Sequence, residues 1–128
     1  MAKNVILDTN FLLIPYQFNV DIFAEIKRIC DFKHELAVLD KTLGELSSIT
    51  EKQKGKNRMA ASFALKLLKG KSLKIIRTHS QKPVDDLLVE HAEKGAIIAT
   101  QDAALKRKIR VKKGKIIILR NKKFLKFE

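Results

Sequence analysis

Acidic side chains in this chain stand at positions that could bring them together for chemistry on a charged substrate. Each of them either follows an apolar, strand-like run or lies in the first turns of a helix-like segment: Asp8, Glu45, Asp85, Asp86 and Asp102. In an open parallel α/β sheet, strands end and helices begin at the same edge, so these positions should share one rim. Carboxylates gathered without basic partners repel one another, and a divalent cation removes that cost.

The chemistry that such a rim favours is metal-assisted hydrolysis. Carboxylate oxygens suit Mg²⁺ or Mn²⁺, whereas the histidines are widely separated and lack the Cys/His spacing of a zinc site. Activation of water and stabilisation of a leaving oxygen by a bound metal would give phosphodiester hydrolysis. Each acid also has a structural explanation, because Asp8 and Asp102 are good helix caps and Asp85 and Asp86 complement a helix dipole.

The elements that must position these acids alternate along the chain. Five apolar runs predict strands: Asn4–Leu7, Glu35–Leu39, Leu73–Ile76, Ala96–Ala99 and Ile116–Leu119. Helical patterns lie between them, at Ile22–Phe32, from Asp40 or Thr42 through Ile49, and at Met59–Leu68, Val84–Glu93 and Asp102–Ile109. This alternation predicts one three-layer α/β/α domain over residues 1–128, with a central, mostly parallel sheet of about five strands.

Three connecting segments complete this expected layout. Phe11–Ile14 reads as a short helical turn that Pro15 stops. The polar stretch Lys52–Asn57 reads as a loop because it contains glycine and several basic residues. The segment at about 120–128 reads as a basic C-terminal tail.

The net charge of +13, from 27 basic and 14 acidic residues, is unevenly distributed. Lys52–Val84 contains ten basic residues and no acidic one, and Lys106–Glu128 contains eleven basic residues and one acidic one. A merely solvated, charge-rich surface would carry matching glutamates, so this imbalance predicts a nucleic acid partner. The expected contacts to phosphate come from five basic residues of these stretches: Lys54, Lys56, Arg58, Lys106 and Arg107.

The sequence favours a cytoplasmic protein with no membrane partner. Its apolar clusters fall far short of the ~20 residues that a membrane span needs. The apolar run near the N-terminus is short and interrupted by charge, unlike a signal peptide. Cys30 is the single cysteine, so no internal disulfide points to an oxidising compartment.

Four segments, in order along nearly the whole chain, resemble the motifs of PIN domains. They are VILDTN at 5–10, LGEL at 43–46, VDDLLVEHA at 84–92 and ATQDAALK at 99–106. The stretches 8–22 and 105–110 are similar to a narrower branch, the PIN proteins related to eukaryotic small-subunit rRNA-processing factors and their short archaeal relatives. This resemblance implies a metal-dependent ribonuclease that acts on single-stranded or structured RNA, in processing such as rRNA maturation.

The resemblance also implies roles for particular residues. Metal ligands would be Asp8, Glu45, Asp85 or Asp86, and Asp102, with Asn10 and Thr100 as polar supports of the site. Asp85 is the preferred ligand of the Asp85–Asp86 pair, because apolar residues follow it at i+3, i+4 and i+7 on one helix face. Asp86 would then cap the helix or assist a second metal. Gln101 departs from the family pattern, which often has a shorter Asn or Asp there.

Three other interpretations compete with this one. A toxin ribonuclease of a toxin–antitoxin pair would share the PIN fold and would need an antitoxin that covers the acidic rim. A catalytically weak RNA-binding factor in ribosome assembly would keep the basic surface but use the acids structurally. A phospho-acceptor receiver domain would need paired acids after its first strand, whereas Thr9 and Asn10 follow Asp8 here. Dimerisation is common among PIN domains, so a homodimer is a further candidate assembly.

Overall fold

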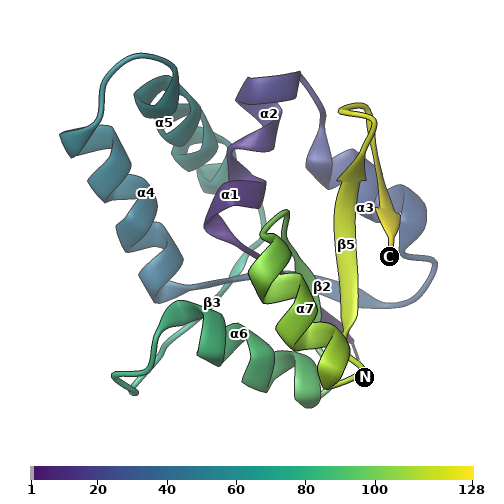
Figure 1. Cartoon of the computed structure of the whole chain (residues 1–128). Helices are drawn as coiled ribbons and strands as arrows, with labels where there is room; N and C mark the ends of the chain where they lie inside the picture. The colour runs from purple at the N-terminus through teal and green to yellow at the C-terminus, as the bar shows by residue number, and fades with distance from the viewer. Residues whose placement is uncertain (1) are drawn as a thin grey trace.

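Six strands form one sheet in the computed structural model, which describes residues 2–128 (Figure 1). Their order across the sheet is β3-β2-β1-β4-β5-β6, and all neighbours are parallel except β5 and β6. The strands are β1 (Lys3–Leu7), β2 (His34–Leu39), β3 (Lys74–Ile76), β4 (Ile97–Ala99), β5 (Lys115–Arg120) and β6 (Phe124–Phe127). The central strand β1 therefore has β2 on one side and β4 on the other, which places the chain's change of winding direction at β1.

Helices fill the connections between the parallel strands. They are α1 (Thr9–Leu12), α2 (Ile14–Phe18), α3 (Ile22–Ile29), α4 (Asp40–Lys52), α5 (Lys56–Lys69), α6 (Val84–Glu93) and α7 (Ala103–Val111). The helix α6 has the bounds that the apolar spacing predicted. Each of α1, α4, α6 and α7 begins beyond the carboxyl end of a strand, as connections between parallel strands require.

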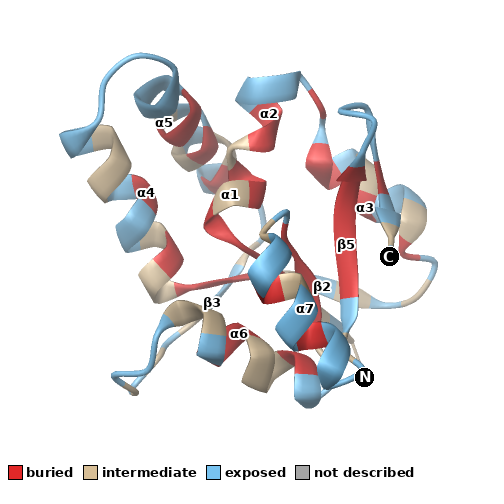
Figure 2. Ribbon diagram, in the orientation of Figure 1, coloured by how far each residue is buried: buried red, intermediate tan, exposed pale blue. Residues whose placement is uncertain are grey.

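Two hydrophobic clusters cover the two faces of the sheet, and period-two alternation in the strands divides residues between them. In β1, Val5 and Leu7 belong to the cluster under the helices α1–α5, whereas Ile6 belongs to the cluster under α6 and α7. The strand β5 alternates in the same way, and its centre is buried (Figure 2). Side chains buried on both faces explain why the strands read as uninterrupted apolar runs. The expected three-layer α/β/α architecture is confirmed.

The segment expected to be a basic tail is instead a sixth strand. Asn121 and Lys122 adopt left-handed φ angles of 54° and 56°, which turn the chain back along β5. The returning strand β6 pairs antiparallel with β5, with Leu119 opposite Leu125. Leu125 is fully buried while its neighbour Lys126 is exposed. Burial alternates along β6, but its residues FLKF do not alternate between apolar and polar types, so the sequence gives little period-two signal for this strand.

Two further expectations need correction. Pro15 does not stop a helical turn but lies in the first turn of α2, where its fixed φ and missing N–H are tolerated. The basic loop expected at Lys52–Asn57 is shorter, since α4 runs through Lys52 and α5 begins at Lys56. Along residues 2–128, no helix has both the length and the apolar character that crossing a membrane requires.

If β6 is an integral strand, replacing its buried leucine should destabilise the whole domain. Leu125→Ala should cost about 2–5 kcal/mol, because the substitution leaves a cavity beneath the sheet edge. Urea unfolding followed by circular dichroism measures this change, with the exposed Lys126→Ala as the matched control. Equal unfolding midpoints for the two variants would mean that the segment does not contribute to the core.

Candidate metal centre

The carboxylate of Asp8 lies at the centre of the predicted rim, where β1 meets β4. The backbone N–H of Asp8 donates to the carbonyl of Ala99, which fixes the end of one strand beside the end of the other. The side chain is only 7% exposed, with Oδ1 accepting from the N–H of Thr9 at 2.9 Å and Oδ2 accepting from the hydroxyl of Thr100 at 2.8 Å. Asp8 is thus held in one orientation and also caps α1.

The hydroxyl of Thr100 joins two of the predicted acids. Thr100 is fully buried, and its Oγ1 donates to Asp8 while accepting from the N–H of Asp102 at 3.1 Å. Asp102 caps α7, since its Oδ1 accepts from the N–H of Leu105 at 3.0 Å. The supporting role expected of Thr100 matches this placement. Asn10 contributes as well, because its Oδ1 accepts from the N–H of Gln101 at 3.3 Å.

Glu45 is connected to the same site from the opposite side, through α4. The hydroxyl of Thr9 donates to Glu45 Oε1 at 3.1 Å. Thr9 was absent from the predicted site residues, although it directly follows Asp8 in the first motif. Its position next to an acid was the available signal, but only the packing of α1 against α4 identifies its partner.

Asp85 and Asp86, at the start of α6, lie in different environments. Asp85 is half-buried, and burial followed by the nearby charge of Asp102 raises the pKa of its carboxyl group. Asp86 is 51% exposed in its side chain and lies 3.9 Å from Nζ of Lys108, at the distance of a solvent-screened ion pair. The geometry therefore favours Asp85 over Asp86 as a member of the rim.

The rim acids interact mainly with one another, although the charge of Lys108 lowers the pKa of Asp85 without reversing the rise that burial and Asp102 cause. Burial is the main cause that raises the pKa of Asp8, and the charges of Asp85 and Glu45 raise it further. Hydrogen bonds from Thr100 and Thr9 act in the opposite direction without reversing the shift. Among residues 2–128, no ion pair joins Asp8, Glu45, Asp85 or Asp102 to a lysine or arginine. A bound cation would remove the repulsion between these groups.

The donor set fits a hard divalent ion in its chemistry, because it consists of carboxylates and hydroxyls. The side chains are not drawn together to ligating distance, however. Within the described part of the chain, no three His, Cys, Asp or Glu side chains are close enough to form a ready-made cluster. The residues that could hold the ion are Asp8, Glu45, Asp85 and Asp102, and occupancy would require their flexible side chains to converge.

The expected RNA-contacting residues fall in two places. Lys54, Lys56 and Arg58 are exposed at the turn between α4 and α5, at the end of α4 remote from Glu45. At the helix rise of 1.5 Å per residue, the last residue of α4, Lys52, lies about 10 Å further along the helix axis than Glu45. On α7, Arg107 is exposed, whereas Lys106 is half-buried with its Nζ 3.7 Å from Glu128 Oε2.

Other polar residues near the rim have structural partners. Gln101 turns away from the acids, and its Oε1 accepts from the N–H of Leu119 at 2.7 Å. Asp40, at the start of α4, accepts from the hydroxyl and N–H of Thr78 at 2.8 and 3.1 Å, which anchors the segment after β3. These contacts separate Gln101 and Asp40 from the candidate ligands.

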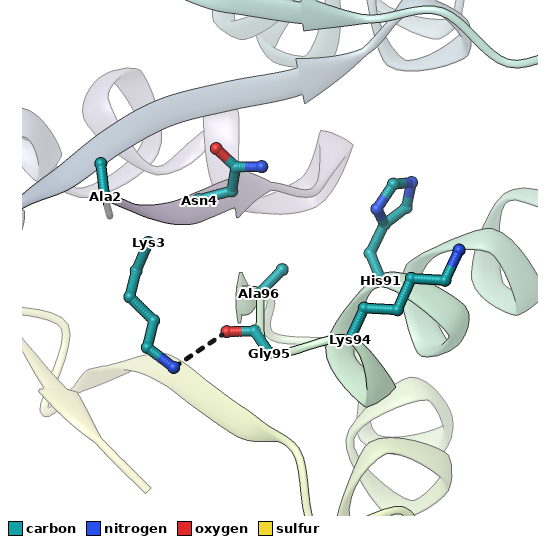
Figure 3. Close-up of a pocket in the computed structure, with 7 residues that line it drawn as sticks. All are labelled: Ala2, Lys3, Asn4, His91, Lys94, Gly95 and Ala96. Atoms are coloured by element: carbon teal, nitrogen blue, oxygen red, sulfur yellow. Dashed lines mark hydrogen bonds between the residues drawn. The ribbon is translucent and has the colours of Figure 1, made fainter.

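The hollow in Figure 3 lies at the other edge of the sheet, at the amino ends of β1 and β4. It has a volume of about 380 Å³, and Nζ of Lys3 crosses it to the carbonyl of Gly95 at 3.5 Å. Its other lining side chains include His91 and Lys94 but no carboxylate. The acidic rim, at the carboxyl ends of the strands, is therefore separate from this hollow.

Comparison with known proteins agrees with the fold. The chain is similar to "Ribonuclease VapC4" of Methanocaldococcus jannaschii, with 27% identity over 94% of this chain and 92% of that protein. It is 32% identical to "Ribonuclease VapC9" of Archaeoglobus fulgidus over 84% of this chain and 76% of that protein. The structure of the PIN domain endonuclease Utp24 superposes with a TM-score of 0.78 at 26% identity, over 98% of this chain and 90% of that one. Residues 5–122 match the model of a family described as "PIN like domain", and the chain belongs to that family.

Proposed function

We propose that the chain is a divalent-metal-dependent ribonuclease that cuts RNA internally at the acidic rim. The observation that carries this proposal is the carboxylate of Asp8, which is buried, oriented by two hydrogen bonds and without a cationic partner among the described residues. A carboxylate kept in such an energetically unfavourable place is a functional-site candidate. Two relatives named as ribonucleases and a similar solved endonuclease support the same reaction class.

The chain's own residues would orient the acids of the site and hold the RNA. Thr100 positions Asp8 and Asp102 together, and Thr9 directs Glu45 toward the same rim. Bound Mg²⁺ or Mn²⁺ would supply an activated water and neutralise charge developing on the phosphate. Internal cleavage would require a continuous RNA strand to lie across the rim. Basic residues on α5 and α7 would hold the phosphates on either side.

The biological setting differs between the two candidate roles that share this chemistry. RNA processing, such as rRNA maturation in the cytoplasm, would need only RNA and a ribosome-assembly partner. A toxin ribonuclease would need an antitoxin that covers the rim. A small neighbouring gene whose product copurifies with the chain and blocks cleavage would establish the toxin role. Its absence, together with cleavage of precursor rRNA, would establish processing.

Neutralising Asp8 should remove the free-energy cost of its buried charge when no metal is bound. Because the pKa of Asp8 is raised from its ordinary value of 3.8, ionisation of Asp8 disfavours the folded state. This cost is absent below the ordinary value and grows as the pH rises toward the raised pKa. In EDTA at neutral pH, Asp8→Asn should therefore unfold at the same urea concentration as wild type or at a higher one.

Asp40→Asn provides the matched contrast. Hydrogen bonds from Thr78 lower the pKa of Asp40, so its ionised form stabilises the fold above the ordinary value and this contribution is lost as the pH falls through the lowered pKa. Asp40→Asn should be destabilised at neutral pH and approach wild type in acid. If Asp8→Asn behaves in the same way, Asp8 is a structural cap and not a strained ligand.

Cleavage should depend on the acids of the proposed rim. Asp8→Asn, Asp85→Asn and Asp102→Asn should each slow cleavage of a single-stranded RNA in Mn²⁺ by more than about 100-fold, since loss of a mere partner of a metal ligand typically costs 10–100-fold. Asp86→Asn removes the same charge one residue away and should retain activity within a few-fold.

Circular dichroism of each variant establishes that it is folded before rates are compared. Wild-type rates in Asp8→Asn would refute the assignment of the catalytic rim. Loss of activity in Asp86→Asn with activity kept in Asp85→Asn would transfer the third ligand position to Asp86.

A further inference from the structure

Large apolar side chains are exposed together where α2 packs beside α5 (Figure 1). Tyr16 is 37% exposed, Met59 53% and Phe63 41%. The Tyr16 and Phe63 rings lie 6.1 Å apart between centroids and are inclined by 59°, and the Tyr16 hydroxyl is 3.3 Å from Met59 Sδ. These three side chains, here called the α2–α5 patch, form one continuous surface. The hydrophobic core does not account for this surface, because more than a third of each residue's area is exposed to solvent.

The patch borders a shallow hollow with a basic margin. The hollow has a volume of about 290 Å³, near the lower end of the roughly 300–1,000 Å³ typical of small-ligand pockets. Its lining consists of Tyr16, Arg58, Met59, Ser62, Phe63 and Lys66. It thus combines aromatic faces with two cationic side chains and contains no carboxylate. A flat, uncharged group attached to an anionic chain has the complementary chemistry.

The charge around the patch favours a polyanion over a symmetric contact with a second copy of this chain as its occupant. The stretch 52–84, which includes all of α5, has ten basic residues and no acidic one. A second copy of this chain would bring the same positive charge against it and be repelled. Exposed aromatic rings next to cationic side chains are the usual platform for unpaired bases and their phosphates. Bases in a duplex are already stacked and would not reach these rings.

We propose that the α2–α5 patch is a base-stacking site for single-stranded RNA, with Tyr16 and Phe63 contacting bases and Arg58 and Lys66 contacting the flanking phosphates. This inference rests on the proposed ribonuclease activity and adds a substrate preference to it. The helix α1 links Asp8 to α2, and α4 links Glu45 to α5. A strand bound at the patch would therefore lie on the two helices that directly follow those carrying one side of the acidic rim.

Binding of a fluorescein-labelled oligouridine, measured by anisotropy in EDTA, tests the site without cleavage. Phe63→Leu keeps an apolar side chain but removes the ring, so its affinity should fall roughly 5- to 150-fold, the loss of one stacked base. Binding of an RNA duplex of equal length should be unchanged. Val111→Ala, which alters an apolar side chain that is 78% exposed on α7, is the control and should bind like wild type.

Salt dependence separates stacking from charge. Phe63→Leu should weaken binding equally at every salt concentration. Replacing Lys54, Lys56 and Arg58 with alanine should instead flatten the slope of log affinity against log salt, by about 0.7 for each phosphate that is no longer neutralised. A Phe63→Leu variant that changes only the salt slope would contradict a stacking role.

The outcomes also distinguish this site from the ribonuclease proposal. Phe63-dependent binding without any cleavage would support the patch and refute the catalytic function. Wild-type oligouridine binding by Phe63→Leu in a protein that cuts RNA would overturn the patch alone. Equal weakening of oligouridine and duplex would also overturn it. If Phe63→Leu binds RNA like wild type but has an altered sedimentation coefficient, the surface joins two copies of the chain and the stacking site is refuted.

Discussion

Burial of the Asp8 carboxylate is the constraint on which the site depends. Placing an ionisable group at the junction of β1 and β4 costs free energy, and the fold offsets only part of that cost with hydrogen bonds from Thr9 and Thr100. The charges that act on this carboxylate are those of other acids, Asp85 and Glu45, and no lysine or arginine among the described residues forms an ion pair with it. A structural cap could be formed at the surface at lower cost, so burial itself indicates a role beyond capping.

The order of the strands explains why several acids reach this one place. The chain passes from β1 to β2 in one direction across the sheet and from β4 to β5 in the other, so β1 and β4 lie side by side at its centre. The helices that leave these strands diverge, and their first turns surround a common edge. Asp8 and Asp102 occupy such positions, and the neighbouring connections bring Glu45 on α4 and Asp85 on α6.

Much of this arrangement could be predicted because it follows from local pattern. The bounds of α6 follow from apolar spacing alone, and the positions of the acids at the ends of strands and starts of helices follow from the geometry of parallel sheets. The contact of Thr9 with Glu45 could not be predicted, because it depends on how α1 packs on α4. The strand β6 was missed because Leu125 is a single buried residue among lysines, and its burial becomes visible only once β5 provides a partner.

The central claim is that Asp8 and its neighbours hold a divalent metal ion, and the most direct measurement is the melting temperature of the metal-free protein as Mg²⁺ or Mn²⁺ is added. Binding to the folded state alone stabilises it by about 2.7 kcal/mol at a hundredfold excess over the dissociation constant. The melting temperature of wild type should rise with metal, and that of Asp8→Asn should rise less. A wild-type melting temperature that stays the same in EDTA, Mg²⁺ and Mn²⁺ would contradict a metal site at this rim.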